Sequence, residues 1–106
     1  MISPVLESFT LATFEPLVGE RFEITTDQGP IDVLLAEANA PPGGGEPDTR
    51  NDEARPPFSI VFHGPLEPIL PQRIYPFRHN GLGSFELFIV PIGPDGDAMQ
   101  YEAVFT

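Results

Sequence analysis

The chain contains no cysteine, no lysine and no tryptophan among its 106 residues. Without cysteine it has no disulfide, no thiolate nucleophile and no cysteine-ligated zinc or iron–sulfur site. Without lysine it can neither form a Schiff base with a carbonyl substrate nor supply the lysine of a phosphate-binding loop. These absences exclude several classes of enzyme before any motif is considered.

Long apolar runs are also missing. Residues 1–7 lack a basic segment followed by an apolar core, and no later stretch approaches the roughly 20 apolar residues of a membrane-spanning helix. We therefore expect neither a signal peptide nor membrane insertion. The expected location is the cytoplasm, with export as part of an assembly as the alternative.

Positive charge is scarce, because five arginines stand against sixteen acidic residues and the formal net charge is -11. A surface of this sign repels the phosphates of nucleic acids and the headgroups of anionic lipids. We expect no nucleic-acid partner. A protein partner, including a basic one, or self-association remains open.

Proline and glycine are abundant, at 14 and 10 residues, and favour many short elements joined by turns over long helices. One short helix is expected near residues 13–18, with Thr13 as its cap and Gly19 after its end. Before it, Phe9 and Leu11 alternate with small or polar residues and predict a short edge strand.

The rest of the chain has the alternation of β-strands. Strand patterns cover Arg21 to Thr26, Ile31 to Ala38, Phe58 to His63 and the segment from Ile74 to Phe105, which contains the turn signals Asn80-Gly81 and Asp95-Gly96. Six or seven short antiparallel strands predict an all-β fold, either a small barrel or a sandwich. We expect one domain over residues 1–106 with a flexible loop at 39–57, whose composition is that of a linker.

The C-terminal segment predicts a three-stranded meander. A two-residue turn at Asn80-Gly81 makes Ile74 face Leu87 and Tyr75 face Glu86, and a longer loop through Gly83 leaves the same residues on each face. Because both faces of residues 84–90 are then largely apolar, we expect this strand to be central and covered on both sides.

Glu86 is the residue that departs from this pattern, since a buried carboxylate needs a partner or a raised pKa. Arg73, Arg78 and Tyr75 on the preceding strand are the expected partners, and a structural ion pair is favoured over a catalytic acid. His63 and His79 lack the spacing of metal ligands. The sequence thus predicts no catalytic residue, no metal and no cofactor.

Four stretches together resemble a known family: Phe85 to Gly93, Tyr101 to Phe105, Phe62 to Pro65 and Gly19 to Phe22. This is a family of small bacterial proteins catalogued as a domain of unknown function, and the resemblance covers nearly the whole chain apart from the loop at 39–57. It implies a genomic context near phage-tail-like or collar-domain fibre proteins. It transfers no functional residue.

Two hypotheses of function follow. The first is a non-catalytic structural or protein-binding module, a component or assembly factor of a surface or phage-tail-like fibre, which binds through short edge strands. The second is a small-molecule binder or enzyme with a site in the barrel mouth around Tyr75, Arg73, Glu86 and His63. The missing catalytic spacing favours the first.

Overall fold

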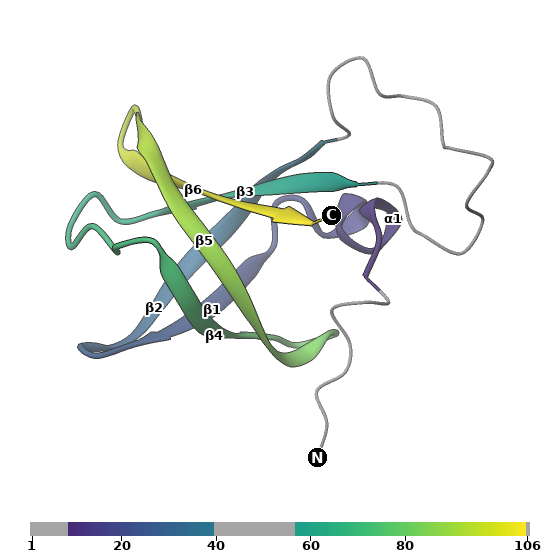
Figure 1. The fold of residues 1–106 in the computed structure, drawn as a ribbon, viewed down its shortest axis with the longest axis horizontal. Coiled ribbons are helices and arrows are strands. Elements are labelled where there is room, and N and C mark those ends of the chain that lie inside the picture. The colour runs from purple at the N-terminus through teal and green to yellow at the C-terminus, as the bar shows by residue number, and fades with distance from the viewer. Residues whose placement is uncertain (1–8, 40–56, 106) are drawn as a thin grey trace.

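The protein is a closed, six-stranded antiparallel β-barrel (Figure 1). A computed structural model describes residues 9–39 and 57–105. The strands are β1 (Arg21–Thr26), β2 (Gly29–Asn39), β3 (Phe58–Gly64), β4 (Arg73–His79), β5 (Gly83–Asp95) and β6 (Ala98–Phe105). The predicted all-β fold is therefore confirmed, and of the two predicted forms, barrel and sandwich, it is the barrel, whereas the predicted loop at 39–57 lies almost wholly outside the described residues.

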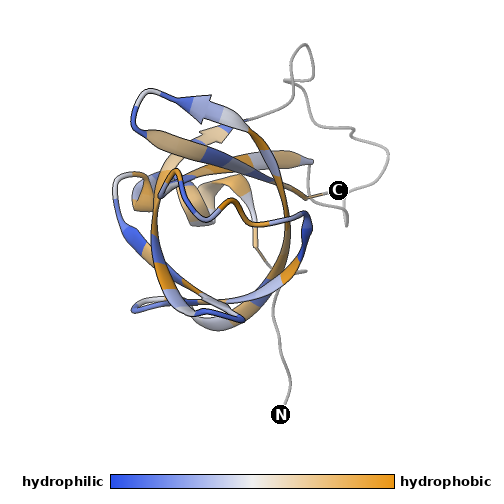
Figure 2. Cartoon of the chain, turned by 90° about the vertical axis from the view of Figure 1, so that its left-hand side faces the viewer, coloured by the Kyte–Doolittle hydropathy of each residue, from blue (hydrophilic) through white to orange (hydrophobic). Residues whose placement is uncertain are grey.

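The order of strands around the barrel is β1-β2-β3-β6-β5-β4, after which β4 pairs with β1. The chain thus forms two three-stranded meanders, joined by a connection over residues 65–72 that crosses one barrel opening (Figure 2). Every strand of the described ranges has a neighbour on both sides. The expected short edge strands, which motivated binding by strand addition, are absent from this part of the chain.

The two meanders meet at joins of very different length. β3 and β6 share seven residue pairs, whereas β1 and β4 share only Glu23 with Arg78 and Ile24 with Phe77. On one side of these two pairs β4 continues with Pro76, which has no N–H to extend the ladder. On the other side the rings of Phe22 and His79 lie 4.4 Å apart, so side chains close the β1/β4 seam where backbone pairing ends.

Aromatic side chains fill the barrel interior. Phe62 lies 5.2 Å from Phe22 and 5.1 Å from Phe77 between ring centroids, and Phe77 stacks on Phe85 at 5.8 Å. All four side chains are buried. Because packed rings occupy the centre, the barrel is a solid core and not a ligand chamber.

A short helical segment closes one end of the barrel. It comprises α1 (Leu11–Phe14) and a 3-10 turn (Glu15–Leu17), so the predicted helix forms but begins earlier than expected. Thr10, not Thr13, precedes the first turn, and its N–H donates to the Thr13 hydroxyl at 3.0 Å. The predicted strand at Phe9 and Leu11 is wrong. Burial of Phe14, whose ring lies 5.3 Å from that of Phe9, outweighs the weak alternation.

The connection over residues 65–72 closes the other end and is tied down by two tyrosines. The Leu70 N–H donates to the Tyr101 hydroxyl at 2.9 Å, and the Tyr75 hydroxyl donates to the Pro71 carbonyl at 2.8 Å. Leu70 itself is buried in the core cluster. The connection thus acts as a lid that is bonded to β4 and β6.

The pairing of β4 with β5 differs from the prediction by one residue. Their loop has three residues, 80–82, and Gly83 follows it at φ +80°, so Tyr75 faces Leu87 and Phe77 faces Phe85. An odd shift exchanges the two faces of a strand. Consequently Glu86 lies opposite Pro76 on the outside of the barrel, not opposite Tyr75.

The turn between β5 and β6 also differs from the predicted turn at Asp95-Gly96. The turn residues are Gly96 and Asp97, and a bulge lies between Pro91 and Gly93. β5 is central, as predicted, because it pairs with both β4 and β6. Its second face is not covered, however, since Phe88 keeps 49% of its surface exposed, and the expectation of two buried faces is wrong.

Candidate functional site

The four residues of the predicted barrel-mouth site do not gather in one place. Tyr75 points inward from β4, and the Arg73 guanidinium lies over its ring at 5.7 Å from the centroid. His63 lies on β3, with its Nε2 3.9 Å from a carboxylate oxygen of Asp95. Glu86 is exposed on the outside of β5. The structure therefore joins only Arg73 and Tyr75.

Glu86 does not need the partner that the sequence predicted for it. Glu86 shares the outward face of β5 with Phe88, and because that face is exposed its side chain lies in solvent, where a carboxylate is stable without a counter-charge. The expected partners bind elsewhere: Arg78 lies 3.6 Å from Glu23, and Arg73 lies 3.8 Å from Asp27. The prediction of a buried, paired Glu86 is wrong.

A small hollow of about 110 Å³ lies at the barrel mouth, between the tip of the β1–β2 hairpin and the 65–72 connection. Arg73 and Tyr75 contribute to its lining, but Glu86 and His63 do not. The Tyr75 hydroxyl, already bonded to Pro71, is the group whose chemistry this environment changes most clearly. Burial raises the pKa of the Tyr75 phenol above its ordinary value of 10.0, and the positive charge of Arg73 opposes part of that rise.

The Tyr75 pKa predicts how stability depends on alkaline pH. As pH rises through about 10, the unfolded chain loses the phenolic proton first and the folded chain retains it, so the free energy of unfolding falls. We expect the stability of the wild type to decline between about pH 9 and about pH 11, and Tyr75→Phe to decline less steeply. Urea unfolding across this range measures both slopes. Equal slopes would contradict the assignment.

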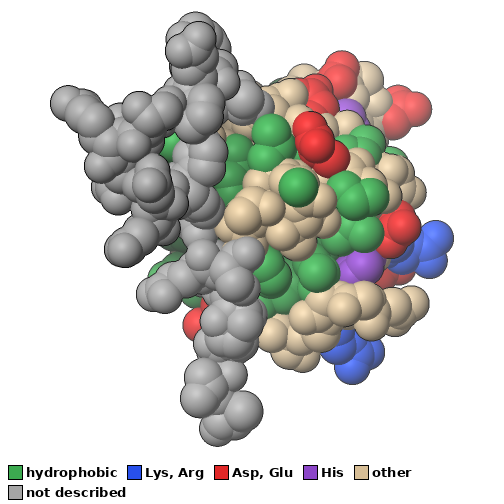
Figure 3. All heavy atoms as spheres, turned by 90° about the vertical axis from the view of Figure 1, so that its right-hand side faces the viewer, with side chains coloured by type: hydrophobic (Ala, Val, Ile, Leu, Met, Phe, Trp, Pro, Cys, Tyr) green, Lys and Arg blue, Asp and Glu red, His purple; other side chains and the backbone are tan. Residues whose placement is uncertain are grey.

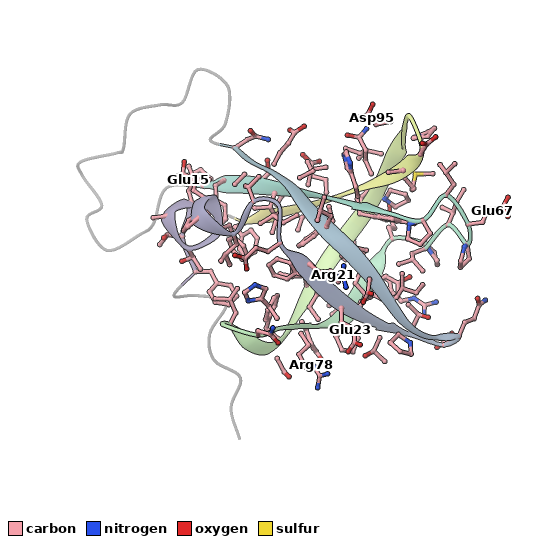
Figure 4. All side chains as sticks on the ribbon, turned by 180° about the vertical axis from the view of Figure 1, so that it is seen from behind. Glu15, Arg21, Glu23, Glu67, Arg78 and Asp95 are labelled. Carbon is pink, nitrogen blue, oxygen red and sulfur yellow. The ribbon has the colours of Figure 1, made fainter. Side chains whose placement is uncertain are left out.

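A larger, shallow groove of about 460 Å³ follows the β1/β4 seam. Its walls carry charges of both signs: Arg21 lies 3.9 Å from Asp32, and Arg78 lies 3.6 Å from Glu23. Figure 4 shows Arg21, Glu23 and Arg78 together on this wall, and in Figure 3 acidic and basic side chains gather beside a histidine at one edge of the α1 end. Such exposed, alternating pairs are typical of a solvated surface and favour no ligand of one charge.

His79 forms the floor of this groove and is the polar residue that sequence reasoning undervalued. Its Nδ1 accepts hydrogen bonds from the N–H groups of Gly81 at 2.9 Å and Leu82 at 3.2 Å. Nε2 must therefore carry the proton, which it donates to Glu20 Oε1 at 2.8 Å. Both ring nitrogens are occupied, so His79 anchors the 80–82 loop and is not free to act as a base. Its position directly before the turn signal Asn80-Gly81 was the available clue.

The outer wall of β4, β5 and β6 carries a band of exposed apolar side chains. Ile74 and Phe88 are a cross-strand pair on the outward face, exposed by 59% and 49%, and Val104 on β6 is exposed by 62%. We call Ile74, Phe88 and Val104 the outer band. β5 crosses the front of the molecule in Figure 1, whereas the groove lies on the wall seen in Figure 4. The predicted register hid this band because it placed Ile74 opposite Leu87, on one face of the meander.

Within residues 9–39 and 57–105 no cluster of three or more histidine and acidic side chains is arranged to hold a metal ion. Each helix in these ranges is too short to cross a membrane.

Comparison with known proteins identifies one family. A family model described as "Domain of unknown function (DUF6916)" matches residues 9–105, which is nearly the whole chain and all of the barrel. No curated protein and no solved structure matches the chain significantly.

Proposed function

The chain belongs to the DUF6916 family, a domain of unknown function, and we propose that it is a non-catalytic module that binds a protein partner through the outer band. The observation that carries this proposal is the exposure of Ile74, Phe88 and Val104 on neighbouring strands. Large apolar side chains exposed on neighbouring strands of a small domain mark interaction surfaces, because their exposure to water is unfavourable until a partner covers them.

The alternative, a small-molecule binder or enzyme, has less support. Phenylalanine rings fill the interior, and the hollow at the barrel mouth is of about 110 Å³, against the roughly 300 Å³ or more of ordinary ligand pockets. His79 uses both nitrogens within the fold. The four residues expected to form the site are spread over three strands, and only Arg73 and Tyr75 lie together.

The resemblance seen in the sequence adds a finer proposal, that the module is a component or assembly factor of a surface or phage-tail-like fibre in a bacterium. A compact barrel with an exposed apolar wall is suited to such a role because its core needs no partner to remain folded. Binding then proceeds through side chains of the outer wall, since the described barrel offers no free strand edge.

The outer band can be tested by polar substitution. We expect Phe88→Gln with Val104→Thr to reduce retention of the native partner at least tenfold, because central aromatic and aliphatic residues dominate binding energy at interfaces. Quantitative cross-linking in extracts of the source cell, read by mass spectrometry, compares the variant with wild type. The matched control is Leu34→Gln with Val18→Thr, which removes apolar groups of similar exposure elsewhere.

The control pair should leave retention unchanged, and both variants should unfold at the urea concentration of the wild type within experimental error. A wild type that is strictly monomeric in light scattering, and that retains no protein which the Phe88→Gln, Val104→Thr variant loses, would refute the proposed function.

A further inference from the structure

The outer band has acidic neighbours that indicate the chemistry of its partner. Resting on the proposed function, we propose that the band binds a basic segment of another protein, in which an apolar side chain covers Phe88 and flanking lysines or arginines meet Glu86 and Glu102. The partner of the outer band would therefore carry positive charge.

The positions of the two carboxylates follow from strand geometry. Glu86 precedes Phe88 by two residues on β5, and Glu102 precedes Val104 by two residues on β6. Side chains two residues apart in a strand lie on the same face at a spacing of about 7 Å. Glu86 is exposed and Glu102 is half-buried, so each places a negative charge beside one apolar member of the band.

These two carboxylates have no cation of their own among the described residues. Each of the three arginines in these ranges already pairs with an acid of β1, β2 or the turn between them: Arg21 with Asp32, Arg73 with Asp27, and Arg78 with Glu23. No ion pair between described residues includes Glu86 or Glu102. A positive group from a partner is therefore the natural complement of this wall.

Charge also argues against a second copy of this chain as the occupant. Each copy has a formal net charge of -11, so two copies repel one another before contact. A twofold dimer through this wall would in addition bring the same acidic wall of both copies together. Lysine and arginine, by contrast, lay their aliphatic stems on apolar surface and their cations on carboxylates or on the face of a phenylalanine ring.

Selection of binding peptides from a random display library on the full chain tests the inference. Counter-selection against Phe88→Gln, Val104→Thr removes peptides that bind other surfaces. We expect the enriched peptides to carry an aromatic or aliphatic residue flanked by lysine or arginine. Their affinity should fall about tenfold in Glu86→Gln with Glu102→Gln, because two exposed ion pairs are lost, and should also fall as salt rises.

The matched control is Glu15→Gln with Glu67→Gln, which makes the same change in net charge at the two ends of the molecule instead of beside Phe88 and Val104 (Figure 4). It should leave affinity nearly unchanged. An equal loss in both double variants would show attraction by net charge alone and would overturn the inference. Enriched peptides that are neutral or acidic overturn it too, yet preserve the proposed function because they still need Phe88. A dimer that Phe88→Gln abolishes identifies a second copy as the occupant and overturns it as well. Failure to enrich any peptide that depends on Phe88 counts against both the basic partner and the proposed function.

Discussion

Replacing Phe62 with alanine should lower the free energy of unfolding by about 3 to 5 kcal/mol. Phe62 is fully buried at the centre of the barrel, and its ring contacts those of Phe22 and Phe77. Removing it deletes apolar contacts and leaves a cavity that a closed barrel cannot collapse easily, because all six strands are bonded to both neighbours. A domain of this size has only about 5 to 15 kcal/mol of stability in total, so the variant should lose a large fraction of it.

The control for this prediction is the same chemical change on the outside of the barrel. Phe88→Ala removes a ring that is half exposed, and we expect it to lower the free energy of unfolding by less than about 1 kcal/mol. Urea unfolding followed by circular dichroism measures both variants. Similar losses at the two positions would mean that the assignment of inner and outer faces is wrong.

Replacing His79 with alanine should cost about 3 kcal/mol of stability, the largest effect expected at a polar residue. The substitution removes the bond to the Glu20 carboxylate, leaves the N–H groups of Gly81 and Leu82 without their acceptor, and takes the ring from its contact with Phe22. The β1/β4 seam loses its side-chain closure at the same time. Urea unfolding gives the loss, and amide exchange at Gly81 and Leu82 should quicken.

Two conservative variants test which nitrogen of His79 carries the proton. His79→Asn places an acceptor oxygen near the position of Nδ1 and should keep much of the protection of the Gly81 and Leu82 amides. Glu20→Gln keeps an acceptor for the Nε2–H group and should cost only about 1 kcal/mol, since it removes the charge but not the hydrogen bond. Rapid exchange at both amides in His79→Asn would contradict the proposed tautomer.

Much of the architecture was predictable because local patterns and global packing agree. The bounds of β1 were predicted exactly as residues 21–26, and the remaining strands within a few residues, from alternation between turn signals. The two apolar faces of β5 favoured a barrel or a sandwich over an open sheet, and the structure is a closed barrel. The premise was nevertheless wrong in part, because Phe88 and Val104 project into solvent and contribute to the candidate interface instead of a second core.

The cross-strand partners in the candidate site depend on the length of the β4–β5 loop, which is one residue longer than the two-residue turn that the sequence favours. Asn80-Gly81 favours a two-residue turn, yet the loop has three residues because Gly83 takes the positive φ and His79 accepts the amides of Gly81 and Leu82. The bond from His79 to Glu20 joins residues 59 positions apart in the sequence, so no local pattern reveals it. The register error that follows placed Glu86 opposite Tyr75, whereas its expected burial came from the second face of β5, which is in fact exposed.

The unequal joins between the two meanders have a mechanical consequence. β3 and β6 share seven residue pairs and β1 and β4 only two, so the β3/β6 join should stay closed when the β1/β4 join opens. Thermal opening of the barrel should therefore begin at the β1/β4 join, which the side chains of Phe22, His79 and Glu20 hold together. The two meanders should then separate while β3 and β6 stay paired. The outer band spans β4, β5 and β6 within one half. A partner bound there would contact only the β4–β6 meander, so opening of the β1/β4 join would not disturb the complex.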